Sequence, residues 1–151
     1  MLGQTGTKDV KYGWQVMRWR LTSAPPEGGT FWAMKAHAKN GQWQYRLQLG
    51  DWVALDAEEG SYFGATPLDV TSTAFYAYSA RLMAKVAALL NKPDDAAEFA
   101  AVEQEARDAF IRHYFTANGD MTVQTQTAHI LTLHFHLVPD MWARATASNC
   151  P

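Results

Sequence analysis

Residues 71–114 read TSTAFYAYSARLMAKVAALLNKPDDAAEFAAVEQEARDAFIRHY, and apolar side chains recur along this stretch at steps of three and four. Such spacing gives an amphipathic helix on each side of Asn91-Lys92-Pro93. The apolar stripes comprise Phe75, Tyr78, Leu82, Met83, Val86, Leu89 and Leu90 in the first half, and Phe99, Val102, Ala106, Ala109, Phe110 and Tyr114 in the second. Because the linker is so short, the two helices are expected to be adjacent and antiparallel.

The ends of these helices carry their own signals. Thr71 or Ser72 is expected to cap the first helix. Pro93 is suited to open the second, and Asp94 and Asp95 fill its first turn, where carboxylates favour the positive end of the helix. The charged face of the second helix is expected to form ion pairs along the helix, through Glu103, Arg107, Asp108 and Arg112.

Weaker patterns flank this pair of helices. Residues 9–22 have helical spacing, and two aromatic runs, 30–36 and 42–49, surround Asn40-Gly41, which is a hairpin signal. Residues 50–68 read as an irregular loop. The sequence therefore predicts a mainly α fold of antiparallel helical hairpins with a small β-hairpin and loop insertion, in a single domain, 1–151. Periodicity leaves open whether the hairpins form a bundle or part of a helical toroid.

A further helix is predicted over Thr127–Leu137, ending before Pro139. It is apolar nearly all round, so it needs partners on every face. We expect a homo-oligomer, a symmetric dimer or larger, that buries Ile130, Leu133, Phe135 and Leu137 between chains. The alternative is that the N-terminal part folds back over the exposed face and gives a compact monomer.

Charge and cysteine content exclude several classes of partner. The net charge of −2 offers no electrostatic footprint for nucleic acid. Cys150 is the one cysteine, which excludes a disulfide framework within the chain. No apolar stretch is long enough for a signal peptide or a membrane span, so a cytoplasmic protein without a membrane partner is expected.

The histidines do not predict a metal site. His134 and His136 would point about 200° apart on a helix, and His129 lies too far from His136 to share an ion without a bend. We interpret all three as ordinary core or boundary histidines, and we expect neither a metal nor another cofactor.

Asp51-Trp52 is the most informative pair for chemistry. It follows Gly50 at the start of the predicted loop, and Asp56, Glu58 and Glu59 follow it. A carboxylate beside an indole suits sugar binding, because the acid can bind hydroxyl groups while the indole stacks on the ring. The structural alternative is a loop aspartate that bonds nearby backbone in a turn.

Five segments, in register from about residue 5 to residue 139, resemble the bacterial α-L-rhamnosidases of glycoside hydrolase family 78. These segments are the stretch from Thr5-Gly6 to Met17-Arg18-Trp19; residues 49–56, LGDWVALD; residues 74–80, AFYAYSA; residues 91–96, NKPDDA; and residues 125–128, TQTA, with Val138-Pro139 beyond. The resemblance implies a segment of the six-hairpin catalytic domain, an α/α toroid that hydrolyses terminal α-L-rhamnosides with inversion.

The resemblance also implies roles for particular residues. Trp52 corresponds to a tryptophan that lines the rhamnose pocket, Asp51 accompanies it, and Gln126 is expected to face the pocket. Two departures from the family pattern are Leu47-Gln48, in place of an aromatic-rich approach, and His129, where the family often has tyrosine. The first puts the shape of the loop in doubt.

The family places its general acid in a D-x-x-R-x-E-R-x-G-W-x-G-D stretch and its base in a W-E-R-W-like stretch, and neither occurs among these 151 residues. The resemblance therefore implies a glycosidase by descent whose isolated chain is weak or inactive. Two alternatives are a non-catalytic helical module that oligomerises or binds carbohydrate, and a small protein with a relocated acid–base site in which Asp51 is catalytic.

Overall fold

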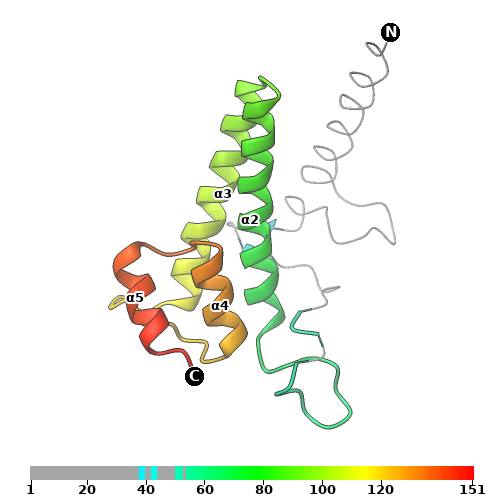
Figure 1. The fold of residues 1–151 in the computed structure, drawn as a ribbon, viewed down its shortest axis with the longest axis vertical. Coiled ribbons are helices and arrows are strands. Elements are labelled where there is room, and N and C mark those ends of the chain that lie inside the picture. Colours follow the sequence, from blue (N-terminus) through cyan, green and yellow to red (C-terminus); the bar gives the residue numbers. More distant parts are fainter. Residues whose placement is uncertain (1–37, 40–41, 44–49, 53) are drawn as a thin grey trace. The chain divides into compact units, whose positions relative to one another are not determined.

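The computed structural model describes residues 38–39, 42–43, 50–52 and 54–151. Its elements are β1 (Ala38–Lys39), β2 (Gln42–Trp43), α2 (Leu68–Leu89), α3 (Pro93–Tyr114), α4 (Gln126–His134) and α5 (Asp140–Ser148) (Figure 1). β1 and β2 pair across Asn40-Gly41, which confirms the position of the predicted hairpin. The helix predicted over 9–22 lies outside the described residues, as do most of both aromatic runs. Within the described part, no helix is long and apolar enough to cross a membrane.

The fold is mainly α, as predicted, and its centre is the antiparallel pair α2 and α3 (Figure 1). Lys92 precedes α3, Pro93 is its first residue, and Asp94 and Asp95 lie in its first turn, which confirms the expected helix start. The residues predicted to form the apolar stripe of α3 are those that it buries. All described residues beyond Ala38 belong to one compact unit, Lys39–Pro151, and a single domain over 1–151 stays a prediction.

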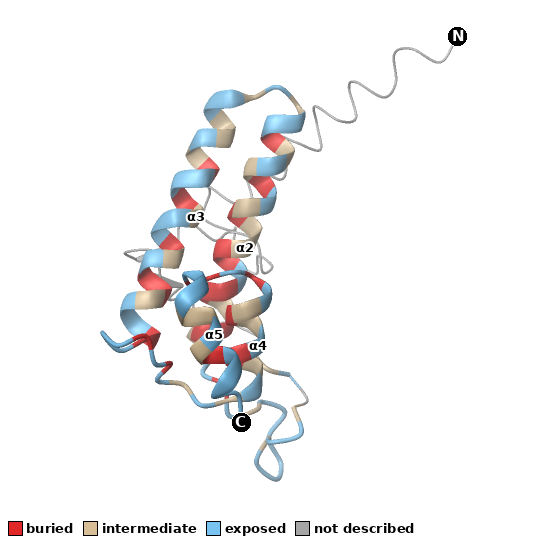
Figure 2. Ribbon diagram, turned by 60° about the vertical axis from the view of Figure 1, so that its left-hand side comes forward, coloured by how far each residue is buried: buried red, intermediate tan, exposed pale blue. Residues whose placement is uncertain are grey.

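The buried face of α2 differs from the predicted stripe. Of the predicted residues only Met83 is buried, whereas Phe75, Leu82 and Leu89 are exposed. The face of α2 that is buried is instead lined mainly by small residues (Val70, Thr73, Ala74, Ala77, Ala80 and Ala87). Small side chains let two helix backbones approach closely, so the alanine-rich face is buried while Phe75, Leu82 and Leu89 stay exposed. Figure 2 marks the buried and exposed positions along α2.

The start of α2 also differs from the prediction. The helix begins at Leu68, directly after Pro67, and no side chain caps it. The Thr71 hydroxyl donates to the Leu68 carbonyl within the first turn, so Thr71 does not act as the cap. Pro67 at the cap position has φ −56°, which leads into the helix, and the Val70 N–H donates to the Pro67 carbonyl and to Asp69 Oδ1, both at 3.1 Å, in place of a threonine or serine cap. Burial raises the pKa of Tyr76 farther along α2, and Glu105 of α3 raises it further.

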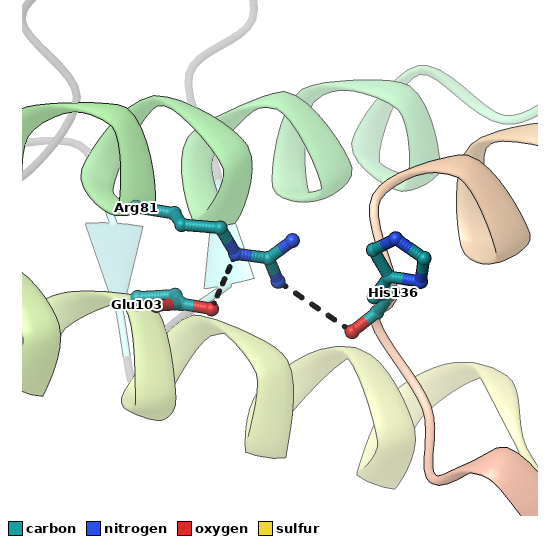
Figure 3. Close-up of polar contacts among 3 residues, drawn as sticks. All are labelled: Arg81, Glu103 and His136. Carbon is teal, nitrogen blue, oxygen red and sulfur yellow. Dashed lines mark hydrogen bonds and ion pairs between the residues drawn. The ribbon is translucent and has the colours of Figure 1, made fainter. Parts of the chain in front are cut away.

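An ion pair links α2 to α3 and to the turn after α4. Arg81 Nε donates to Glu103 Oε1 at 2.8 Å, and Arg81 Nη2 reaches the His136 carbonyl at 3.5 Å (Figure 3). His136 has a positive φ of 50°, which turns the chain after α4. Glu103 therefore pairs between helices and not along α3 as predicted. Asp108 accepts a hydrogen bond from Gln104, and its ion pair with Arg112 stays a prediction.

The third predicted helix is shorter than expected, and much of its apolar surface is covered within the chain. α4 ends at His134, and Phe135 and Leu137 are buried in the turn that follows. The Phe135 ring stacks on Tyr78 of α2 at a centroid distance of 4.2 Å. Phe135 and Leu137 are thus unavailable for contacts between chains, because both side chains are already buried within the chain.

The sequence patterns did not predict α5. Contrary to the prediction, Pro139 does not end the helix before it, because α4 already ends at His134; Pro139 instead precedes the next helix, with Asp140 in the first turn. Trp142 of α5 stacks on Phe115 at a centroid distance of 5.7 Å. A Cβ on Gly119 would lie 2.7 Å from the Trp142 ring, so only glycine allows the indole to sit this close. The proline–aspartate pair is the signal that could have identified α5.

Candidate functional site

The segment between β2 and α2 folds back on itself around Asp51-Trp52. Gly50 adopts a positive φ of 56°, and an antiparallel bridge pairs Trp52 with Phe63. The Gly64 N–H donates to the Asp51 carbonyl at 2.9 Å, which closes the same turn. We call residues 50–66 the Asp51 loop. The loop is irregular, as predicted, and its first residues lie next to its last.

Aromatic side chains gather around Trp52. The Tyr62 ring stacks on the indole at a centroid distance of 5.3 Å with 8° between the planes, and Phe63 meets the indole edge-on at 5.3 Å. Trp52 is 50% exposed and Tyr62 is 66% exposed. Exposed, mutually supported rings offer rigid apolar faces to a ligand. The sequence analysis missed Tyr62 and Phe63, although two adjacent aromatic residues within a polar loop were a usable signal.

The Asp51 carboxylate is partly buried and points to a side chain. Its Oδ2 accepts from the Thr66 hydroxyl at 3.1 Å. A Cβ on Gly64 would lie 3.2 Å from Asp51 Oδ2 and 2.6 Å from Asp56 Oδ1, so both carboxylates converge on this glycine. A bond to Thr66, 15 residues away, differs from the local turn bond of the structural alternative.

Gln126 is the first residue of α4, and its neighbour Thr125 caps the helix by accepting from the Ala128 N–H at 3.3 Å. The Thr66 and Thr125 hydroxyl oxygens lie 2.8 Å apart. The structure therefore brings Asp51 to the start of α4, where Gln126 is exposed, through two threonines that the sequence analysis did not single out. No sequence signal marks Thr66, because its partner is 59 positions away.

The histidines occupy different environments. His129 is fully buried in α4, and its Nδ1 donates to the Thr125 carbonyl at 2.9 Å. His134 and His136 are exposed. Among the residues that the structure describes, no cluster of three or more histidine, cysteine, aspartate or glutamate side chains could hold a metal ion.

Comparison with known families assigns the chain. Residues 29–150 match the bacterial α-L-rhamnosidase six-hairpin glycosidase domain. The chain belongs to this family. The match includes the Asp51 loop and all of α2 to α5, so it covers every described element that positions Asp51, Trp52 and Gln126.

Two α-L-rhamnosidases show the same similarity. The chain is 39% identical over 100 residues to an α-L-rhamnosidase of Streptomyces avermitilis, which covers 66% of this chain and 9% of that protein. It is 37% identical over 95 residues to an α-L-rhamnosidase of Formosa agariphila, covering 61% of this chain and 10% of that protein. The chain therefore spans about a tenth of the length of these relatives.

Two solved rhamnosidase structures resemble the fold. The structure of the Streptomyces avermitilis α-L-rhamnosidase complexed with L-rhamnose superposes with a TM-score of 0.65 at 32% identity, over 79% of this chain and 11% of that one. An Aspergillus terreus α-L-rhamnosidase superposes with a TM-score of 0.78 at 21% identity, over 92% of this chain and 15% of that one. The helical hairpins of this segment are thus part of a rhamnosidase toroid, which decides between the bundle and the toroid.

Proposed function

We propose that this rhamnosidase segment supplies part of a rhamnose-binding site. We also propose that a rhamnosidase containing it hydrolyses terminal α-L-rhamnosides with inversion. The observation that carries the proposal is the exposed Trp52 beside Asp51, linked by hydrogen bonds to the start of α4 where Gln126 lies. The solved Streptomyces relative complexed with L-rhamnose supports this class of ligand.

The chemistry of these side chains suits a deoxy sugar. L-Rhamnose has an apolar face, including its methyl group, that can lie on an indole. Trp52 offers that surface, and Tyr62 behind it holds the indole in place. The second oxygen of the Asp51 carboxylate can accept hydrogen bonds from ring hydroxyls, and the Gln126 amide can both accept and donate them. Binding therefore combines one stacking surface with a few polar groups that orient the sugar.

Hydrolysis with inversion needs a carboxylic acid and a carboxylate base roughly 6.5–9.5 Å apart on opposite faces of the sugar. The family motifs that carry this pair do not occur among these 151 residues. Asp51 is already engaged by Thr66, so we assign it to binding and orientation. A catalytic Asp51 remains the second hypothesis, and a non-catalytic carbohydrate-binding module remains the third.

The proposed binding role predicts a specific effect of changing Trp52. Trp52→Ala should weaken binding of methyl α-L-rhamnoside at least about tenfold, because it removes the stacking surface. Trp52→Phe should retain most of the affinity. Calorimetry or NMR titration measures both, and Phe75→Ala serves as the control because Phe75 is a partly exposed aromatic residue outside the loop. Unchanged affinity in Trp52→Ala would contradict the proposal.

We also propose that the isolated chain self-associates, through a different surface from that expected from the sequence. Phe75, Leu82 and Leu89 are exposed and are spaced seven residues apart, which places them on one face of α2. Leu89 is 86% exposed, and an apolar stripe of this kind favours burial against another chain. Ile130 also stays exposed.

Self-association predicts that light scattering at micromolar concentration gives a mass above 16.9 kDa. The double variant Leu82→Glu/Leu89→Glu should return the mass to that of one chain, because like charges then meet across the stripe. A wild-type chain that elutes as a clean monomer overturns this proposal without affecting the sugar-binding one.

A further inference from the structure

Three side chains form a continuous hydrogen-bonded chain between the Asp51 loop and α4. The Thr66 hydroxyl donates to Asp51 Oδ2 at 3.1 Å, the two threonine hydroxyl oxygens are 2.8 Å apart, and Thr125 Oγ1 accepts from the Ala128 N–H at 3.3 Å. Thr66 is 3% exposed, so its hydroxyl is shielded from water. A buried hydroxyl in this position has to find its partners within the protein.

Counting protons gives the chain one direction. A hydroxyl has one proton, and Thr66 uses its proton on the carboxylate, which accepts. The contact between the two threonines then requires Thr125 to donate. Thr125 in turn accepts from the first turn of α4. Every hydrogen bond therefore points from the N-terminus of α4 toward Asp51. In this arrangement each bond polarises and strengthens the next. The positive end of the α4 dipole also favours the negative charge of the Asp51 carboxylate.

Two further hydrogen-bonded contacts among the described residues of the Asp51 loop stay within the loop. The Gly64–Asp51 backbone bond and the Trp52–Phe63 bridge both close the loop on itself. The Thr66–Thr125 bond spans 59 positions of sequence and joins the loop to the cap of α4. Its loss would remove this direct link between the loop and the helix that carries Gln126.

We propose that Thr66 and Thr125 are positioning residues for sugar binding: they fix the Asp51-Trp52 pair against the start of α4, so that Trp52 and Gln126 act on the same ligand. This inference rests on the proposed function. Neither threonine is assigned a contact with the sugar. Their effect on affinity passes through Asp51, which carries Trp52 as its neighbour in sequence.

The test removes one hydroxyl and keeps the shape. Thr66→Val should weaken binding of methyl α-L-rhamnoside about tenfold, the size expected for one lost hydrogen bond to a charged group, and Thr66→Ser should restore most of it. The Trp52 indole N–H signal, assigned as the NMR peak that disappears in Trp52→Phe, should shift or broaden in Thr66→Val but not in Thr66→Ser. These two readouts separate positioning from general destabilisation.

Thr132→Val is the matched control, because Thr132 is also fully buried and its hydroxyl donates to the Ala128 carbonyl within α4. It should change neither the affinity nor the Trp52 signal. If Thr66→Val fails to fold, Thr125→Asp takes its place, since aspartate keeps the cap but has no proton to donate to Thr66. It should reproduce the changed Trp52 signal.

The outcomes separate this inference from the function on which it rests. A folded Thr66→Val that keeps both wild-type affinity and the wild-type Trp52 signal overturns the positioning role. A wild-type chain that does not bind the rhamnoside overturns the proposed function instead. In that case the Trp52 signal of the same variants still shows whether the two threonines position the loop.

Discussion

The 151-residue chain alone is expected to release no aryl alcohol from an aryl α-L-rhamnoside above the buffer rate. A positioned general acid or base contributes typically 10²–10⁴-fold to the rate of hydrolysis. The family motifs that supply both groups do not occur in this sequence, so both contributions should be missing. The measurement is a continuous absorbance assay at high protein concentration, with a full-length rhamnosidase as the positive control.

The same assay tests the hypothesis of a relocated site. Asp51 and Asp56 both approach Gly64, so a carboxylate pair is present in the loop. Turnover that survives repurification and disappears in Asp51→Asn would show that Asp51 is catalytic and that the binding assignment is incomplete. Other aryl glycosides, assayed in parallel, identify the sugar preference of any activity that is found.

The helical hairpin was predictable because its signals are local. The linker at 91–93 ends one helix and opens the next, and the aspartates after Pro93 mark the start of α3. The buried set of α3 follows directly from its spacing, because the charged residues lie on the opposite face, where each is exposed or half-buried and Glu103 is paired with a neighbouring side chain. Along α3 the residues that the sequence pattern predicts to be buried are the ones that tertiary packing buries.

The orientation of α2 was not predictable from the same reasoning. Hydrophobic size suggests that Phe75, Leu82 and Leu89 face the core, whereas the structure buries alanines against α3. The helix is apolar on more than one face, and spacing cannot say which face meets which neighbour. In a toroid each hairpin packs against neighbouring hairpins on both sides. A second apolar face on α2 therefore suits packing against a neighbouring hairpin, and the hairpin alone does not explain it.

The candidate site divides in the same way. The adjacent Asp51 and Trp52 could be read from the sequence because carboxylate and indole stand side by side. Thr66 could not, because its role arises only when the loop meets Thr125. Tyr62 lies ten positions from Trp52, and only the bridge between Trp52 and Phe63 brings the two rings into a stack. Contacts between residues that are far apart in the sequence cannot be predicted from the pattern of neighbouring residues.

The largest loss of stability is expected from Phe110→Ala. Phe110 is fully buried in α3 and contacts the rings of Tyr114 and Phe115 at centroid distances of 4.9 and 6.3 Å. Phe115 in turn stacks on Trp142, so this aromatic cluster ties α3 to α5. Removing a buried phenylalanine costs about 3–5 kcal/mol, through lost burial and the cavity left behind. That is a large part of the stability of an ordinary domain.

The cluster also supports the candidate site. The Tyr114 hydroxyl donates to Asp69 Oδ2 at 2.9 Å, in the first turn of α2, which follows the Asp51 loop.

Urea unfolding followed by circular dichroism measures the loss of stability in Phe110→Ala. Phe75→Ala is the matched control, because the same atoms are removed from a ring that is 37% exposed, and it should cost clearly less. Equal losses in the two variants would mean that Phe110 does not anchor the core, because burial is what distinguishes the two rings.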